Sequence, residues 1–295
     1  MGGMGHEMDS LARRVSRRLR RLGIRAGVTR PADTESLLLE ADLLRRRLQL
    51  VRDALGRRAP TASVVEEEMI PLDYERAPLR IVASAYRRQA TAAKEPFTVE
   101  WIEQSLRGGG VLYDVGANVG GYSLIAAAQN PSVRVVAFEP AYKNYAALCD
   151  NIVGNGFADR VVPVPLVLGW KTHLASFRHR RLIVGGARHD SRAAPGELDW
   201  EPEYEQPVLV ASLDELVRWF GLPSPTHAKV DVDGAEIEVF RGAVETLTAP
   251  SLRGILVEMA DDPDAIGALL REAGFELRQV HETPAVSYGV FERPA

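Results

Sequence analysis

From residue 111 onward the sequence alternates short apolar runs with longer segments of helical periodicity. Strands that alternate with helices predict a mostly parallel sheet covered by helices on both faces. The last two expected strands have no helix between them, so they should form an antiparallel hairpin at the edge of the sheet. The expected strands are 111–115, 133–139, 160–168, 208–210, 227–232, 254–259, 275–281 and 286–292, and the expected helices are 98–106, 122–130, 142–155, 213–220, 235–243 and 263–274.

The first part of the chain has a different composition, and we expect a basic helical N-terminal extension at residues 1–60 and one domain at 61–295. Residues 1–58 hold 14 arginines and 7 acidic residues, a net charge of +7, whereas the remainder carries −11. Residues 9–24 pattern as an amphipathic helix with an arginine-rich face, which suits either peripheral contact with an anionic membrane or a solvated basic helix. Residues 33–57 carry a heptad seam, which suits either a homo-oligomer or packing on the chain's own body.

Composition excludes several classes of protein. The single cysteine, Cys149, rules out an intrachain disulfide and argues against zinc-thiolate and iron–sulfur sites. The net charge of −4 gives no sign of nucleic-acid binding. No apolar run is long enough to span a bilayer, and the charged start lacks the apolar core of a secretory signal, so a cytoplasmic location is expected.

Acidic residues follow several of the expected strands. Asp114, Glu139, Asp231, Asp233 and Glu258 all lie at or just past a strand end. Because ligands of open parallel sheets bind beyond the carboxyl ends of the strands, these side chains should share one rim at the binding site. The alternative for Asp114 and Glu139 is a helix cap or a surface salt bridge.

The loop after the first of these strands indicates what kind of ligand the rim would hold. Residues 116–121 lack the Gly-x-Gly-x-x-Gly spacing of a dinucleotide site, and Asp114 just before them would repel an anion. A cationic ligand without phosphate fits better, and S-adenosylmethionine is one. Gly116 and Gly120 would let the backbone approach its methionine part, Asp114 would favour its ammonium group, and Glu139 would accept its ribose hydroxyls.

At this point the sequence resembles a known family. The segments YDVGANVGGYSLIAA, VVAFEPAYKNYAALCDNIVGN, SLDELV, HAKVDVDGAEIEVFRGA and ILVEM occur in the order and spacing of FkbM-type methyltransferases, over about residues 95–260. The resemblance implies a Rossmann-like class I methyltransferase fold with a mostly parallel seven-stranded sheet. It also implies S-adenosylmethionine-dependent O-methylation of a hydroxyl on a sugar, a secondary metabolite or a glycan. The cofactor-binding residues would be Asp114, Gly116, Asn118, Gly120, Glu139 and Asp231.

The chain departs from the family pattern at two places. Where the family often has Val-Glu-Gly, this chain has Val232, Asp233 and Gly234, which keeps the charge. After the third strand the family usually has a small residue followed by polar ones, whereas this chain has the apolar residues 166–168. The adenine contacts therefore do not follow from the resemblance.

Methyl transfer to an alcohol needs an aligned acceptor oxygen and a group that takes its proton. Asp231 is the candidate for the base or for a ligand of a base-assisting metal. Lys229 lies two residues earlier, on the same side of the strand, and would pair with Asp231 or orient the acceptor. Glu236 is expected to stabilise a helix N-terminus, and Glu258 to face the substrate or support the site. Strand-end carboxylates would suit Mg²⁺, but the sequence requires no metal.

The long stretch 184–206 contains His189, Asp190, Trp200 and Tyr204, and we expect it to cover the acceptor. Two other functions remain open at this point. An NAD-dependent oxidoreductase is disfavoured by the loop spacing and by Asp114. The second is a protein that has the same fold but binds a partner without catalysing a reaction. The intact set of candidate cofactor-binding residues disfavours it, although that set does not prove catalytic activity.

Overall fold

The computed structural model describes residues 67–187, 189–191, 200–260 and 262–294. The chain divides into two compact units, Met1–Ala54 and Leu55–Ala295, and every described residue belongs to the second. The predicted basic extension at 1–60, with its amphipathic segment 9–24 and its heptad seam, therefore lies outside the described residues. None of the helices in the described ranges is long and apolar enough to cross a membrane.

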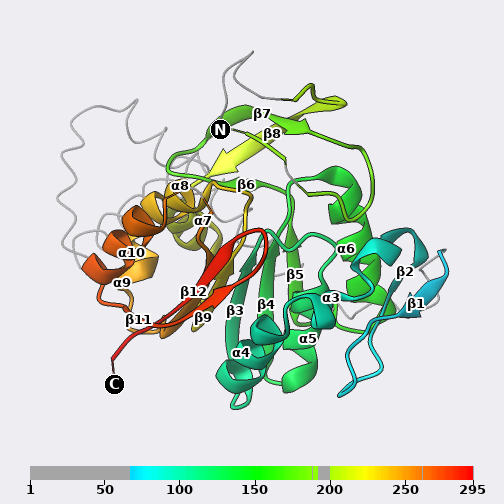
Figure 1. Cartoon of the computed structure of the whole chain (residues 1–295), viewed down its shortest axis with the longest axis horizontal. Helices are drawn as coiled ribbons and strands as arrows, with labels where there is room; N and C mark the ends of the chain where they lie inside the picture. Colours follow the sequence, from blue (N-terminus) through cyan, green and yellow to red (C-terminus); the bar gives the residue numbers. More distant parts are fainter. Residues whose placement is uncertain (1–66, 188, 192–199, 261, 295) are drawn as a thin grey trace, which may run out of the picture. The chain divides into compact units, whose positions relative to one another are not determined.

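The centre of the described unit is a seven-stranded sheet, as predicted (Figure 1). Its order is β11-β12-β10-β9-β3-β4-β5, and all neighbours are parallel except β12, which runs antiparallel to both β10 and β11. The chain starts in the middle at β3, moves outward to β5 and returns to β9 on the other side of β3, so the switch point lies between β3 and β9. The strands are β3 (Gly110–Val115), β4 (Val133–Phe138), β5 (Val161–Val164), β9 (His227–Val230), β10 (Gly254–Glu258), β11 (Glu276–Glu282) and β12 (Ser287–Glu292).

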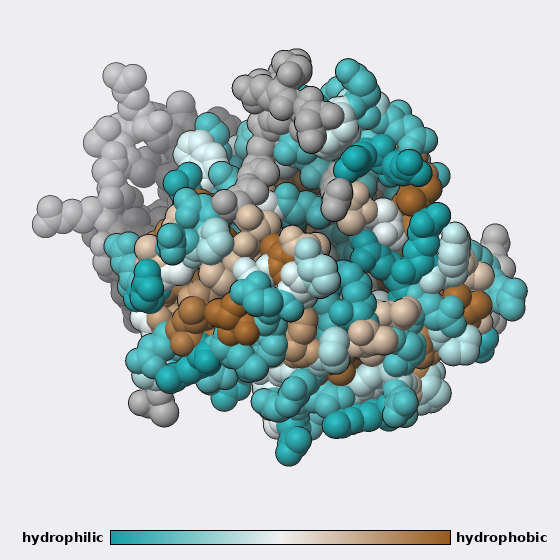
Figure 2. All heavy atoms as spheres, viewed as in Figure 1, coloured by the Kyte–Doolittle hydropathy of each residue, from teal (hydrophilic) through white to brown (hydrophobic). Residues whose placement is uncertain are grey.

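Helices cover both faces of this sheet because its strands are apolar on both sides. In β4, Val135 packs into one core with α4, α5 and α6, whereas Val136 packs into the opposite core with α7, α8, α9 and α10. The face of the molecule seen in Figure 2 is mostly hydrophilic, with smaller hydrophobic patches. The helices are α4 (Pro96–Leu106), α5 (Gly121–Gln129), α6 (Tyr142–Gly154), α7 (Leu213–Phe220), α8 (Glu236–Arg241), α9 (Val244–Thr248) and α10 (Pro263–Glu272).

A second sheet of three strands interrupts the alternation between β5 and α7. It consists of β6 (Val167–Leu168), β7 (His173–His179) and β8 (Tyr204–Ala211), in the order β6-β8-β7. The single strand expected at 160–168 is wrong, since Pro165, which lacks a donor for a sheet ladder, follows β5 directly. β7 lies between the expected strands 160–168 and 208–210, where no strand was expected, and β8 starts four residues before the expected strand at 208.

The segment before α4 had no clear prediction and forms short elements. They are the antiparallel pair β1 (Met69–Pro71) and β2 (Arg80–Val82), the 3₁₀ helix η2 (Ala83–Arg88) and α3 (Thr91–Lys94). Asn151 of α6 and Asn155, which follows that helix, fasten β2. The Asn151 side chain accepts from the Val82 amide at 2.7 Å, and the Asn155 side chain accepts from the Arg80 amide at 2.9 Å. These bonds fix the position from which η2 and α3 reach the ligand-binding end of the sheet.

Gly116 sets the spacing between the two halves of the sheet at the switch point. It has a φ of 84°, and a Cβ atom there would lie 1.9 Å from the backbone oxygen of Asp231. The Asp231 amide in turn donates to the Val115 carbonyl at 3.0 Å. The loops after β3 and β9 therefore touch through bare backbone, which only glycine allows.

We expect Gly116→Ala to destabilise the protein by about 2–4 kcal/mol, because it adds a backbone clash to the strain of a positive φ. The matched control is Gly156→Ala, which also has a positive φ of 71° but no atom within 4 Å of the added Cβ. That variant should lose only about 1 kcal/mol. Urea unfolding of both variants measures the difference, and equal losses would show that the Asp231 contact is unimportant.

Candidate active site

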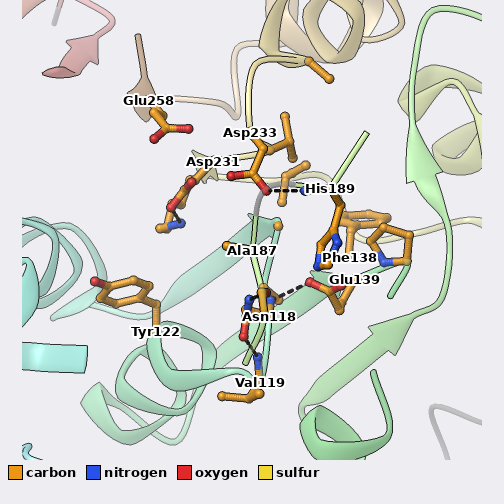
Figure 3. A pocket seen from close by; sticks show the side chains of 18 of the residues that line it. Asn118, Val119, Tyr122, Phe138, Glu139, Ala187, His189, Asp231, Asp233 and Glu258 are labelled. Carbon is orange, nitrogen blue, oxygen red and sulfur yellow. Dashed lines mark hydrogen bonds and ion pairs between the residues drawn. The ribbon is translucent and has the colours of Figure 1, made fainter. Parts of the chain in front are cut away.

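A cavity of about 190 Å³ lies at the carboxyl ends of β3, β4, β9 and β10 (Figure 3). Its floor is the loop after β3, and one wall carries Glu139. Another wall carries Lys229, Asp231, Asp233 and Glu258. Residues 186–187 and 189–191, together with the elements η2 and α3, enclose the remaining sides. The rim of carboxylates predicted from the strand ends is thus largely one site.

Asn118 organises the floor of the cavity. Its φ of 52° lies in the left-handed region, a strained conformation that asparagine tolerates better than most residues. Its amide donates to Glu139 Oε2 at 2.8 Å, and its side-chain Nδ2 donates to the Gly186 carbonyl at 2.8 Å. One residue therefore links the loop after β3 to the strand-end acid and to the segment above the cavity.

Glu139 is an acceptor held in place by backbone amides. It is 4% exposed, and its oxygens accept from the amides of Asn118 and Ala141, each at 2.8 Å. Burial outweighs these bonds and raises the pKa of the Glu139 carboxyl to about 7. A carboxylate has more acceptor sites than these two bonds use, so it can still accept from ligand hydroxyls.

Lys229 is a buried cation among carboxylates. It is 1% exposed, and its Nζ lies 2.8 Å from Asp231 Oδ2 and 5.1 Å from the centre of the Tyr122 ring. Burial alone would lower the pKa of Lys229, but Asp231, Asp114 and Glu95 raise it above its ordinary value. Burial would likewise raise the pKa of Asp231, but the lysine lowers it. The predicted pairing of these two residues is confirmed.

Two of the predicted cofactor-binding residues lie behind the cavity wall. Asp114 is fully buried and accepts from Ser123 Oγ at 2.6 Å, while its Oδ1 has no hydrogen-bond partner among the described residues. Burial raises its pKa, and nearby Lys229 opposes that effect. Gly120 is also outside the lining, and a Cβ there would lie 2.5 Å from Leu148 Cδ1 of α6. Their positions give Asp114 the role of countercharge to Lys229 and Gly120 a role in helix packing.

Glu236 has the structural role expected of it. It is 1% exposed, and its Oε1 accepts from the amides of Val232 at 3.1 Å and Gly234 at 3.2 Å, which fixes the turn before α8. Asp233 lines the cavity instead, with a φ of 55°, and its Oδ2 accepts from the His189 amide at 3.3 Å. In the ranges described, no group of three or more His, Cys, Asp or Glu side chains could hold a metal ion.

Residues 182–187 and 189–191 are fastened over the cavity by α6 and η2. Lys143 Nζ donates to the Leu182 carbonyl at 2.9 Å, Asn144 Oδ1 accepts from the Gly185 amide at 2.8 Å, and Arg88 Nε donates to the Gly185 carbonyl at 2.9 Å. Of the residues singled out in the stretch 184–206, His189 and Asp190 line the cavity, whereas Trp200 and Tyr204 do not. Asn118 thus ties this covering segment to the floor.

Sequence reasoning missed the part of the cavity that comes from outside the regular alternation. Glu95, 2% exposed, accepts from Tyr122 Oη at 2.8 Å and from Tyr288 Oη at 3.5 Å, and pairs with Lys94 at 2.5 Å. Residues 64–96 show no periodicity that could have revealed η2 and α3. At the other end, the cavity is apolar, with Phe138, Leu166, Leu168 and Phe177 in its lining.

The family profile of the "Methyltransferase FkbM domain" matches residues 114–277. This range includes the end of β3, all of β4, β9 and β10, and all the cavity carboxylates except Glu95. The chain belongs to the FkbM methyltransferase family. The resemblance and the fold predicted from the sequence are both confirmed, and a methyltransferase is the class of enzyme that this family defines.

The chain is 31% identical over 196 residues to the 31-O-demethyl-FK506 methyltransferase FkbM of Streptomyces tacrolimicus, covering 58% of this chain and 74% of that protein. It is 28% identical over 163 residues to the hexuronic acid methyltransferase AglP of Haloferax volcanii, covering 55% of this chain and 62% of that protein. Among solved structures, it is similar to a methyltransferase FkbM from Methylobacillus flagellatus KT, with 13% identity and a TM-score of 0.44. That similarity covers 68% of this chain and 60% of the other.

We expect Lys229→Met to lower the free energy of unfolding by about 3–5 kcal/mol near neutral pH, because it leaves buried carboxylates without their cation. Because the pKa of Asp231 is lowered in the folded protein, its ionised carboxylate stabilises the wild-type fold at pH values above the ordinary pKa of an aspartate. This stabilisation is lost only as the pH falls through the lowered pKa. In the variant the pKa of Asp231 rises instead, so protonation relieves the defect.

Urea unfolding at pH 5 and pH 8 should therefore show a smaller defect at pH 5. The matched control is Arg218→Met, which breaks the exposed pair between Arg218 and Glu245 and should leave the unfolding midpoint unchanged at both pH values. A Lys229→Met defect that is small, or that does not depend on pH, would contradict the central role of this lysine.

Proposed function

We propose that this protein is an S-adenosylmethionine-dependent O-methyltransferase that acts on a hydroxyl group of a sugar, a secondary metabolite or a glycan. The observation that carries the proposal is the arrangement of one carboxylate, Glu139, and a separate carboxylate wall around a cavity whose glycine loop lacks dinucleotide spacing. Glycine loops that bind pyrophosphate favour anions, whereas this site favours a ligand with hydroxyls and positive charge.

The residues fit the parts of S-adenosylmethionine one by one. Glu139 would accept the ribose hydroxyls, and the apolar end of the cavity around Leu166, Leu168 and Phe177 would hold the adenine. Asp231 on the opposite wall would face the positively charged methionine end. These carboxylates would repel a phosphate group, and S-adenosylmethionine contains none.

When bound, the cofactor supplies an electrophilic methyl group, which an acceptor oxygen takes up as it loses its proton. The protein's part is to hold the acceptor in line, to stabilise positive charge and to receive the proton. Asp231 is suited to stabilising charge, since Lys229 keeps it ionised, and for the same reason it is a weak base. Lys229 acts by fixing Asp231 and not by touching the acceptor.

The acceptor side of the cavity favours a polar molecule. Arg88, Thr91, Lys94, Ser191 and Tyr288 all contribute hydrogen-bonding groups to the lining. The names of two relatives point to a polyketide hydroxyl and to a hexuronic acid as acceptors. Both kinds of molecule are rich in oxygen. We therefore place a sugar or polyketide hydroxyl first among the acceptor classes.

Calorimetric titration with S-adenosylmethionine, S-adenosylhomocysteine and NAD⁺ tests the cofactor. We expect micromolar binding of the first two, lost in Glu139→Ala, followed by transfer of labelled methyl to members of a panel of methyl glycosides, uronic acids and macrolides. Binding of NAD⁺ alone would favour an oxidoreductase. Binding of none of the three would favour a non-catalytic partner protein.

The pKa of Glu139, about 7, predicts a pH dependence of product binding. Ribose hydroxyls donate to the ionised carboxylate, so binding should release a proton below pH 7, and affinity for S-adenosylhomocysteine should fall about tenfold for each pH unit below that value. Glu139→Gln cannot ionise, so it should bind more weakly with a flat profile. Calorimetry from pH 5.5 to pH 8.5 measures both, and parallel profiles for the two proteins would contradict the assignment.

A further inference from the structure

Glu258 lies on the methionine side of the cavity and has no assigned role. It ends β10, one residue beyond the parallel register pair Val257 and Val230, so it is next to Asp231, which follows β9. Figure 3 shows its carboxylate on the side of Asp231 and Asp233, away from Glu139. It therefore faces the part of the site where the methyl group and the acceptor meet, and not the part that holds the ribose.

The cavity carboxylates differ in how their oxygens are used. Asp231 Oδ2 is engaged by Lys229, and Asp233 Oδ2 accepts from the His189 amide. Glu258 Oε2 is buried and has no hydrogen-bond partner among the described residues. A buried acceptor oxygen without a donor is unfavourable, so a hydroxyl group brought in by a ligand would satisfy it.

The surroundings of Glu258 also keep its proton affinity high. Burial, together with the nearby Asp231, Glu236 and Asp233, raises the pKa of Glu258 to about 8, against the opposing effect of Lys229. From β12, Tyr288 is its register partner, and the pKa of that phenol is raised by burial and by neighbouring carboxylates, so it stays protonated. A base whose pKa lies near the working pH takes a proton more effectively than one held ionised by a lysine.

We propose that Glu258 is the general base that receives the proton of the acceptor hydroxyl, while Asp231 remains the ionised partner of Lys229. This inference rests on the proposed function. As the O–H bond breaks, its proton goes to Glu258 Oε2 and the oxygen's electron pair forms the new O–CH₃ bond. The electron pair of the broken C–S bond stays on sulfur as a neutral thioether, and Glu258 later releases the proton to water.

The first test needs no acceptor. Sinefungin carries a protonated amine where S-adenosylmethionine carries its sulfonium methyl, so a carboxylate facing that position should favour sinefungin over S-adenosylhomocysteine. In Glu258→Gln, assayed at pH 8.5, we expect the affinity for S-adenosylhomocysteine to stay within about twofold and the preference for sinefungin to fall about tenfold. The matched control is Glu282→Gln in the same hairpin as Tyr288, on the exposed strand β11, which should change neither value.

The second test uses the acceptor that the methyl-transfer panel identifies. Glu258→Gln should lower kcat about 10²- to 10⁴-fold with little change in acceptor KM, and it should abolish the fall of kcat on the acid side of the pH profile. Asp231→Asn should lower kcat but keep that acid limb. A residue with a purely structural role would not produce this difference between the two variants.

An unchanged preference for sinefungin, or an acid limb that persists in Glu258→Gln, would overturn the assignment of the base. Failure of the wild-type protein to bind S-adenosylhomocysteine or sinefungin would instead refute the proposed function, and the inference with it. The two failures are thus distinguished before any acceptor is tested.

Discussion

The ammonium of Lys229 is the charge on which the ligand-binding end of the sheet depends. It is buried at the switch point, where β9 returns beside β3, and it is surrounded by Asp114, Asp231 and Glu95. Without it, like charges would be forced together in a region of low dielectric constant. With it, Asp231 is held ionised beside the buried Asp114, so the close contact of the loops after β3 and β9 becomes electrostatically tolerable.

The same lysine divides the carboxylates into different roles. Asp231 touches it and becomes a fixed negative charge. The pKa of Glu258, one strand further out, is raised by burial and by its acidic neighbours, against the opposing effect of the lysine. Glu139 lies on the other side of the loop after β3, and backbone amides orient it. Burial thus raises the pKa of Asp114, Glu139 and Glu258, whereas Asp231, which is hydrogen-bonded to the buried cation, has a lowered pKa.

The sequence predicted the sheet, its edge hairpin and most of the rim, because alternation of strands and helices is a repeated signal and strand ends share one edge. It could not show that Asp114 lies behind the wall of the cavity. The alternation of side chains along a strand predicts which face of the sheet a residue lies on, but not whether that residue reaches a cavity. It also missed Glu95, whose position depends on the tertiary bonds that Asn151 and Asn155 make to β2. The split of the third strand follows from Pro165, a local signal that its apolar surroundings masked.

The regular and irregular parts of the chain therefore contribute differently to function. The regular alternation builds Glu139 and the lysine–aspartate pair. The short helices η2 and α3 precede that alternation, and residues 186–187 and 189–191 lie in a connection between strands, so no periodicity predicts this part of the lining. Connections tolerate changes of sequence better than packed strands do, because fewer of their side chains lie in a core. Under the proposed function, such a protein would keep its methyl donor and change its acceptor through substitutions in η2, α3 and the residues over the cavity, without disturbing the buried charges beneath them.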